Sequence, residues 1–192
     1  EMTDATYGAL AESVRRLIDA TIRTEVGADT VAAVTAKLDA ATAQLRAALM
    51  PGSFGQRCGD DGQPVASGNV VIGVRNPVAP PLTMHHEPDG SVWTEFILGA
   101  AYEGPVGHVH GGVCAMILDH VLGATAHQPG RPAATGTLTL RYERGTPLNR
   151  PLRAEARVDR TDGRKVLAIG QLGDVGGATV RAEGVFILPR PQ

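Results

Sequence analysis

The sequence predicts an α+β fold, in which a curved antiparallel sheet wraps around a central helix and a helical hairpin precedes the sheet. Two observations lead to this prediction. Apolar residues recur at spacings of three and four up to about residue 50, whereas from about residue 70 they alternate with polar residues. One apolar helical segment, at about 111–126, interrupts the alternating region with hardly a charge, so we expect it to be buried on most sides.

The size, charge and cysteine content limit the class of protein. The 192 residues fit one compact domain with an appendage. A formal net charge of −2 gives no reason to expect DNA or another polyanionic macromolecule as a partner. No apolar run approaches the roughly 18 residues of a membrane span. With two cysteines and no secretory signal pattern, we expect a cytoplasmic protein that has no membrane span and no nucleic acid partner.

The N-terminal segment, residues 1–50, is predicted to be a hairpin of two amphipathic helices. The stretch from Gly27 to Asp29 supplies a stop and a new N-terminal cap, and Pro51-Gly52 ends the second helix. The periodic apolar positions are Leu10, Val14, Leu17, Ile18, Ile22, Val31, Val34, Leu38, Ala41, Leu45 and Leu49. Residues 51–69, rich in Gly, Pro, Ser and Asp, are predicted to be a linker, and residues 70–192 the main domain.

The main domain contains six candidate strands around the apolar helix. They are predicted at 70–75, 92–98, 134–143, 152–161, 165–173 and 178–188. Asp162-Gly163 is a strong signal for a tight turn between the fourth and fifth strands, and Gly176-Gly177 for another between the fifth and sixth. The strand order therefore favours an antiparallel sheet with hairpin connections.

The stretch from Gly107 to Gly112, which precedes the apolar helix, is the first candidate for chemistry. Gly111 and Gly112 stand at the helix N-terminus, where the lack of side chains lets a ligand approach the backbone. The free N–H groups and the helix dipole there suit a carbonyl oxygen that becomes an oxyanion. This is half of an acyl-transfer site.

Asp119 is the second candidate, because it is the only charged residue in the first two turns of the apolar helix. Its neighbours three and four positions away are small or apolar, namely Ala115, Met116, Leu122 and Gly123. Two interpretations stay open. The carboxylate either caps or hydrogen-bonds to a neighbouring strand, or is held ready as a base or nucleophile near neutral pH.

The spacing of these two candidates predicts a shared site. Gly111 and Asp119 are eight residues apart, about 12 Å along one helix, which is too far to serve one carbonyl. If both act on the same carbonyl, they must come from two helices that lie antiparallel in a dimer. We therefore expect a homodimer or a dimer of dimers, with two symmetric sites at an isologous interface.

Four stretches of the chain resemble the hot dog acyl-CoA thioesterases of the phenylacetate-pathway (PaaI-like) type. They are Glu103-Gly104-Pro105 through His110-Gly111-Gly112, Leu118-Asp119 with Gly123, Thr135 to Leu148 including Tyr142, Arg144 and Pro147-Leu148, and Asp162-Gly163-Arg164-Lys165-Val166. Together with the strands between them they cover roughly residues 70–189. The resemblance implies the hot dog fold, in which a curved antiparallel sheet wraps around a central helix.

The resemblance also implies an activity, the hydrolysis of the thioester of a fatty or aryl acyl-CoA to the free acid and coenzyme A. In it, Asp119 is the nucleophile or general base and the Gly111 amide polarises the thioester carbonyl, while His110 stabilises the turn or touches the thioester. Gly112 belongs to the substrate-binding backbone. The coenzyme A thioester is the substrate, so the resemblance implies no separate cofactor.

A hydroxyl from the strand after the helix, on the other subunit, commonly completes such sites. Thr135 or Thr137 matches it, with Thr135 preferred, and their even spacing predicts that both lie on one face of the strand. The sequence departs from the family at one position. Many relatives place Asn or Gln six residues before the histidine, where this chain has Gly104, so we expect no water-positioning amide here.

A basic stretch follows the helix. From Arg131 to Lys165 there are nine basic residues against four acidic ones, which fits the phosphates of coenzyme A. The family motif favours Arg164 and Lys165 as phosphate contacts, and Arg144 is a further candidate. The alternative is a solvated polar strand face, because several of these arginines alternate with apolar residues.

Other functions are less well supported by the sequence. The pairs His85-His86 and His108-x-His110 lack the further ligands of an ordinary zinc site, so we expect no metal. The alternative function is a non-catalytic hot dog protein that binds acyl-CoA as a sensor or regulator. A DNA-reading hairpin is disfavoured, because residues 1–50 hold five basic and seven acidic residues. The hairpin is then an interface element or a lid over the acyl tunnel.

Overall fold

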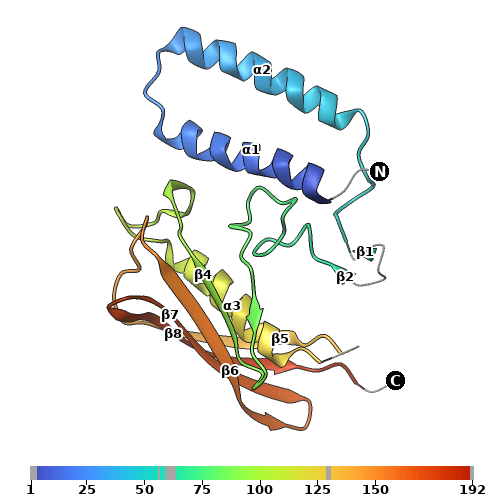
Figure 1. Ribbon diagram of the computed structural model, residues 1–192, viewed down its shortest axis with the longest axis vertical. Coiled ribbons are helices and arrows are strands. Elements are labelled where there is room, and N and C mark those ends of the chain that lie inside the picture. The colour runs from blue at the N-terminus through green and yellow to red at the C-terminus, as the bar shows by residue number, and fades with distance from the viewer. Residues whose placement is uncertain (1–3, 56, 59–63, 129–130, 191–192) are drawn as a thin grey trace.

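Figure 1 shows the computed structural model of the chain, which describes residues 4–55, 57–58, 64–128 and 131–190. The helices are α1 (Asp4–Arg23), α2 (Ala28–Arg46), the short 3-10 helix η1 (Ala100–Tyr102) and α3 (Gly111–Ala126). The strands are β1 (Arg57–Cys58), β2 (Pro64–Val65), β3 (His85–His86), β4 (Val92–Phe96), β5 (Ala134–Tyr142), β6 (Leu152–Asp162), β7 (Lys165–Asp174) and β8 (Gly177–Ile187).

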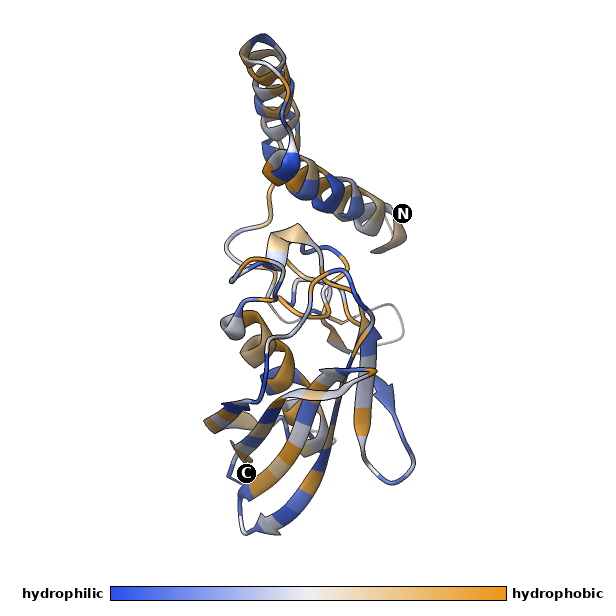
Figure 2. Cartoon of the chain, turned by 90° about the vertical axis from the view of Figure 1, so that its left-hand side faces the viewer, coloured by the Kyte–Doolittle hydropathy of each residue, from blue (hydrophilic) through white to orange (hydrophobic). Residues whose placement is uncertain are grey.

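The main sheet has six strands in the order β3-β4-β6-β7-β8-β5, and every neighbouring pair is antiparallel. Strands β6, β7 and β8 curve around α3, which lies against their inner face (Figure 1). Alternating hydropathy along these strands gives one apolar and one polar face (Figure 2). The sheet therefore presents its apolar side to the helix and its polar side to the solvent.

The core lies between α3 and the sheet. Ile117, Leu118, Val121 and Leu122 of α3 are fully buried, and Phe186 of β8 packs with them. Each such side chain contributes about 1.5–3 kcal/mol relative to its exposed state. This burial on several sides explains why the helix is almost free of charge, and it fixes the position of the residues at the two ends of α3.

Helix α1 is attached to the domain through Arg15. The Arg15 guanidinium donates to the carbonyl oxygens of Ala79 and Asn76, at 2.9 Å each. The Tyr7 ring lies 3.5 Å under the guanidinium of Arg75, and Ala11 is buried. These contacts tie α1 to the loop that precedes β3.

Helix α2 lies on the far side of α1 from the sheet (Figure 1) and has no buried residue. Its apolar positions stay open, with Val31 at 47% and Leu45 at 52% exposure. None of the helices in the described ranges is both long and apolar enough to cross a membrane. The N-terminal helices are therefore an appendage that adds little to the core.

One predicted strand is wrong. Residues 70–75 form a series of turns, because the Asn69 side chain accepts hydrogen bonds from the N–H groups of Val71 (2.7 Å) and Ile72 (3.0 Å). The N–H of Gly73 then bonds to the Asn69 carbonyl at 3.0 Å. The other five predicted strands and the helix at 111–126 are present, and β1 and β2 lie within the predicted linker. Of that linker, residues 56 and 59–63 lie outside the described residues.

Candidate active site

His110 caps the N-terminus of α3. Its ring nitrogen Nδ1 accepts a hydrogen bond from the backbone N–H of Gly112 at 2.9 Å. A ring nitrogen that accepts carries no proton, so this contact requires a neutral imidazole with its proton on Nε2. His110 therefore holds the first turn of the helix through one ring nitrogen.

The loop before α3 is anchored to the segment that follows β5. The N–H of Val109 donates to the carbonyl of Thr146 at 2.8 Å. Gly104 packs so closely under the turn that a Cβ on it would lie 2.7 Å from the Cα of His110. A side chain there would collide with the backbone, which gives a steric reason for glycine at this position.

The backbone N–H of Gly111 has no hydrogen-bond partner in the described part of the chain. In the same peptide unit, the carbonyl of His110 accepts from the N–H groups of Val113 (2.9 Å) and Cys114 (3.2 Å), so it points into the helix. The N–H of a trans peptide points opposite to its carbonyl, so the Gly111 N–H points away from the helix at the positive end of its dipole. This is the geometry of an oxyanion donor, whereas the N–H of Gly112 already binds His110.

Asp119 lies in the middle of α3 and is half-buried. The hydroxyl of Thr135, at the start of β5, donates to its Oδ1 at 2.8 Å. Oδ2 has no partner among the described residues, so it can accept from a water or another ligand. The predicted bond to a neighbouring strand is thus present, and the same bond fixes the carboxylate with one oxygen free. This hydroxyl belongs to the same chain as Asp119.

The expectation that Thr135 and Thr137 share a face of the strand is wrong. Thr135 pairs with Phe186 of β8 and Thr137 pairs with the adjacent Val185, because the register shifts between the two threonines. Adjacent residues of β8 point to opposite faces, so the two threonines do as well. The extra residue is Gly136, and it directs only Thr135 toward Asp119.

Strand β5 contacts both ends of the candidate site. At its start Thr135 binds Asp119, and at its end the Tyr142 hydroxyl donates to the carbonyl of Gly111 at 2.8 Å. Sequence reasoning named Tyr142 only as part of a family motif and gave it no role. The available signal was a single aromatic residue that ends a strand of alternating threonine and leucine.

The predicted phosphate contacts lie at two different turns. The guanidinium of Arg144 forms an ion pair with Asp174 and donates to the carbonyl of Gly177 at 2.8 Å, and the Asp174 contact raises the pKa of Arg144. Arg164 uses its Nε to bind the carbonyl of Leu188 at 2.9 Å. Lys165 is exposed and has no ion-pair partner among the described residues. The two family-motif residues therefore keep free donors, whereas the Arg144 guanidinium is already bound to the turn between β7 and β8.

Other candidate nucleophiles and ligands are used in the fold. Burial raises the pKa of the Cys114 thiol, which lies 3.6 Å from the Thr146 hydroxyl inside the core. Burial lowers the pKa of His120, and His127 accepts the N–H of Ala133 at 3.0 Å. Within the described ranges, no three His, Cys, Asp or Glu side chains gather as a metal site would require.

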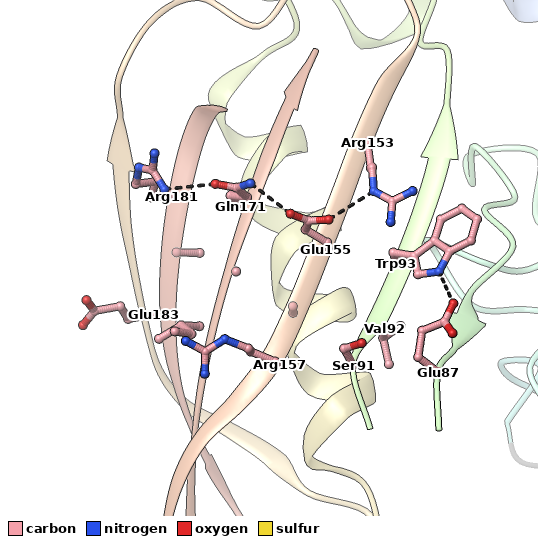
Figure 3. A pocket seen from close by; sticks show the side chains of 14 residues that line it. Glu87, Ser91, Val92, Trp93, Arg153, Glu155, Arg157, Gln171, Arg181 and Glu183 are labelled. Atoms are coloured by element: carbon pink, nitrogen blue, oxygen red, sulfur yellow. Dashed lines mark hydrogen bonds and ion pairs between the residues drawn. The ribbon is translucent and has the colours of Figure 1, made fainter. Parts of the chain in front are cut away.

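A groove of about 550 Å³ lies on the outer face of the sheet, away from α3 (Figure 3). Its polar side chains pair with one another: Arg181 donates to Gln171 at 3.0 Å, Gln171 to Glu155 at 2.9 Å, and Arg153 to Glu155 at 3.1 Å. Trp93 forms one wall. No predicted site residue lines this groove, so it is separate from the candidate active site.

The chain is similar to known proteins in both sequence and structure. A family model for the thioesterase superfamily matches residues 106–172, which include the glycine turn, Asp119 and β5. The crystal structure of the thioesterase superfamily protein RHA08564 is 34% identical, with a TM-score of 0.84, and the match covers 94% of both chains. The chain belongs to the thioesterase superfamily. The predicted hot dog fold with N-terminal helices is confirmed.

Two more distant structures match a little more than half of this chain. A phenylacetic acid degradation-related protein from Ralstonia eutropha is 23% identical with a TM-score of 0.52, and the match covers 56% of this chain and 85% of that one. Protein BH2602 of Bacillus halodurans, solved with CoA, is 22% identical with a TM-score of 0.52, over 59% and 77% of the two chains. By contrast, the match to RHA08564 covers 94% of this chain. A match of that length cannot leave out both N-terminal helices.

Proposed function

We propose that this thioesterase superfamily protein hydrolyses the thioester of a fatty or aryl acyl-CoA. The observation that carries the proposal is the free N–H of Gly111 at the positive end of α3, on the same helix as Asp119 and its Thr135 contact. A donor for an oxyanion and a fixed carboxylate are the two groups that acyl transfer to water requires.

The ligand class is supported by two related structures. Protein BH2602 was solved with CoA, and the smu.793 protein of Streptococcus mutans, 15% identical to this chain, was solved bound to acetyl CoA. In this chain Arg164 and Lys165 keep free donors beside the turn between β6 and β7. We assign them to the phosphates of coenzyme A, because charged donors pair best with phosphate oxygens.

The proposed site is shared by two subunits, since Gly111 and Asp119 are about 12 Å apart along α3. In the described residues β5 pairs with β8 on one side only, so its other edge is open. If two copies pair along this edge, antiparallel symmetry sets the Thr135 end of one strand beside the Tyr142 end of the other. Asp119 of one subunit then approaches Gly111 of the partner subunit.

The proposed reaction is the addition of water to the thioester carbonyl. With Asp119 as general base, its carboxylate takes a proton from the water, the oxygen adds to the carbonyl carbon, and the Gly111 N–H binds the oxyanion. Collapse of the intermediate breaks the carbon–sulfur bond, and the departing thiolate takes the proton. With Asp119 as nucleophile, the carboxylate oxygen adds first and the carbon–sulfur bond breaks, so that the CoA thiolate leaves and a mixed anhydride forms. Water then hydrolyses the anhydride to the free acid and the Asp119 carboxylate, and the proton released by the water goes to the thiolate.

We also propose that the protein works in the cytoplasm. Both Cys58 and Cys114 are free thiols. Unpaired cysteines are the rule in reducing compartments, where thiol pools prevent disulfides from forming.

The proposal is tested by the release of free coenzyme A from a panel of acyl-CoAs. We expect Asp119→Asn and Asp119→Ala to lower kcat by about 100-fold or more, because a positioned base contributes on that scale. Asp159→Asn is the matched control, since Asp159 is an exposed acid on β6. Full activity in both Asp119 variants contradicts the assignment. Tight acyl-CoA binding by a wild type that hydrolyses none of the panel supports the alternative of a non-catalytic binding protein.

A further inference from the structure

Tyr142 is the last residue of β5 and lies against the first turn of α3. Its hydroxyl donates to the carbonyl of Gly111 at 2.8 Å. Its ring is so near that a Cβ on Gly111 would lie 3.3 Å from the ring and the hydroxyl oxygen. The tyrosine therefore contacts the residue that carries the free N–H, although its side chain is 54% exposed.

The peptide unit between Gly111 and Gly112 is held at both ends. Tyr142 binds its carbonyl oxygen at 2.8 Å, and Nδ1 of His110 binds its N–H at 2.9 Å. The unit is planar and rigid, so two contacts on opposite ends fix its orientation. The Gly111 Cα joins this unit directly to the preceding one, between His110 and Gly111, which bears the free N–H.

Glycine is the residue that most needs such a restraint. It has no side chain and loses more conformational freedom on folding than any other residue. The Gly111 N–H is oriented by the two hydrogen bonds that the His110 carbonyl accepts, but two glycines in a row provide no side chain that would hold the Gly111 Cα in place. A hydrogen-bond donor on the neighbouring strand removes that freedom at Gly111 itself.

The direction of the Tyr142 bond is well defined. A backbone carbonyl can only accept, so the phenol is the donor. Burial raises the pKa of Tyr142 above its ordinary value, and the nearby Cys114 thiol adds to the rise. The phenol therefore stays protonated at neutral pH and keeps the bond.

We propose that Tyr142 is a positioning residue for the oxyanion donor: by holding the Gly111–Gly112 peptide unit it fixes the Gly111 Cα, so that the Gly111 N–H points at the thioester carbonyl. The inference rests on the proposed function. Because an oxyanion gains more from an aligned donor than a neutral carbonyl does, the restraint acts on the transition state. Its loss should lower kcat and leave KM nearly unchanged.

The first test compares Tyr142→Phe with Tyr102→Phe. Both variants keep the ring and remove a hydroxyl that donates to a carbonyl, at Gly111 in the first case and at Val78 (2.9 Å) in the second. For Tyr142→Phe we expect kcat to fall about tenfold and KM to change less than about twofold, as for the loss of one ordinary hydrogen bond. Tyr102→Phe should retain kcat.

The second test measures binding, which separates positioning from a general loss of structure. One acyl-CoA analogue replaces the sulfur by a methylene and carries two fluorines beside the ketone, so that the ketone is hydrated to a tetrahedral centre like that of the intermediate. The other analogue is a thioether without a carbonyl. We expect Tyr142→Phe to weaken binding of the hydrated ketone several-fold and to leave thioether binding unchanged.

Each outcome decides one of the two proposals. An unchanged kcat in Tyr142→Phe, or an equal loss of affinity for both analogues, overturns the positioning role. A wild type that hydrolyses no acyl-CoA overturns the proposed function instead. In that event, the ratio of the two analogue affinities still tests the role of Tyr142, because it needs no turnover.

Discussion

Thr135 and Asp119 form a bond in which a neutral hydroxyl donates to a carboxylate at 2.8 Å. Such a bond fixes the rotamer of the carboxylate, which as a free side chain would rotate among staggered positions. A carboxylate that acts as a base or nucleophile needs such a fixed position. In the proposed site, Thr135 thus orients Asp119 before substrate binds.

The pair Thr135→Val and Thr137→Val tests this role. Valine keeps the size and branching of threonine and removes the hydroxyl. We expect Thr135→Val to lower kcat/KM about tenfold to 100-fold, since a hydrogen bond to a charged group contributes about 1.5–3 kcal/mol. Thr137 points to the opposite face of β5, so Thr137→Val should retain wild-type activity. Equal losses in the two variants contradict the assignment to Thr135.

These residues show how far the site could be predicted from the sequence. Gly111 and Asp119 were identified because a glycine pair at a helix start and a lone acid in an apolar helix are both local patterns. The choice between the threonines was open, because it depends on a register shift at Gly136. There a Cβ would lie 3.2 Å from the carbonyl oxygen of Val185, which is a contact across strands that no local pattern encodes.

The N-terminus of α3 combines a rigid element with a flexible sequence. Burial of Ile117, Leu118 and Leu122 fixes the helix axis. His110 and Tyr142 fix the peptide between the two glycines at its start. Because burial fixes the helix and hydrogen bonds fix its first peptide, the backbone does not have to move when the Gly111 N–H binds an oxyanion. Such preorganisation is the condition for effective oxyanion stabilisation.

A comparison of Gly111→Pro with Gly111→Ala separates the effect of losing the N–H from the effect of adding a side chain. Both add a Cβ beside Tyr142, but only proline removes the N–H. Proline suits the first helical position, and His110, with φ −59° and ψ 135°, already has the backbone that a residue before proline prefers. We expect Gly111→Pro to lower kcat by about 100-fold to 1,000-fold beyond the alanine variant, as for the loss of one oxyanion donor.

Circular dichroism checks that both variants keep their helix content. Equal kcat values for proline and alanine would mean that the Gly111 N–H takes no part in the reaction. The comparison needs no assumption about the tyrosine, because any displacement of Tyr142 by the new Cβ is common to both variants.

The elements themselves were predictable where the local pattern and the tertiary structure agree. The helix at 111–126 and the strands from 134 onward follow from periodicity, because the buried face decides the period. The prediction of a strand at 70–75 was wrong. The run of apolar residues resembles a strand, but the Asn69 side chain accepts hydrogen bonds that turn the chain. Side-chain to backbone bonds of this kind compete with strand formation over a few residues.

At the scale of the whole molecule, the open edge of β5 and the apolar side of α2 are surfaces that no other described element covers. A nine-residue edge strand that is paired on one side only is a template for another strand. Helix α2 exposes Val31 and Leu45 with nothing from the described chain over them. The edge of β5 lies beside the candidate site, which is why we assign the dimer to it.

Mixed dimers test whether the two halves of the site come from different subunits. Asp119→Asn disables one half and Gly111→Pro the other, so either variant alone should be nearly inactive. In a mixed dimer, one site combines Asp119 from the glycine variant with Gly111 of the partner subunit, and both are intact. We expect mixed dimers, isolated by two different affinity tags after co-expression, to recover about half of the wild-type activity, because one of two symmetric sites is restored. If each chain held a complete site, both sites of a mixed dimer would carry a defect, and the isolated dimers would stay as inactive as the parents.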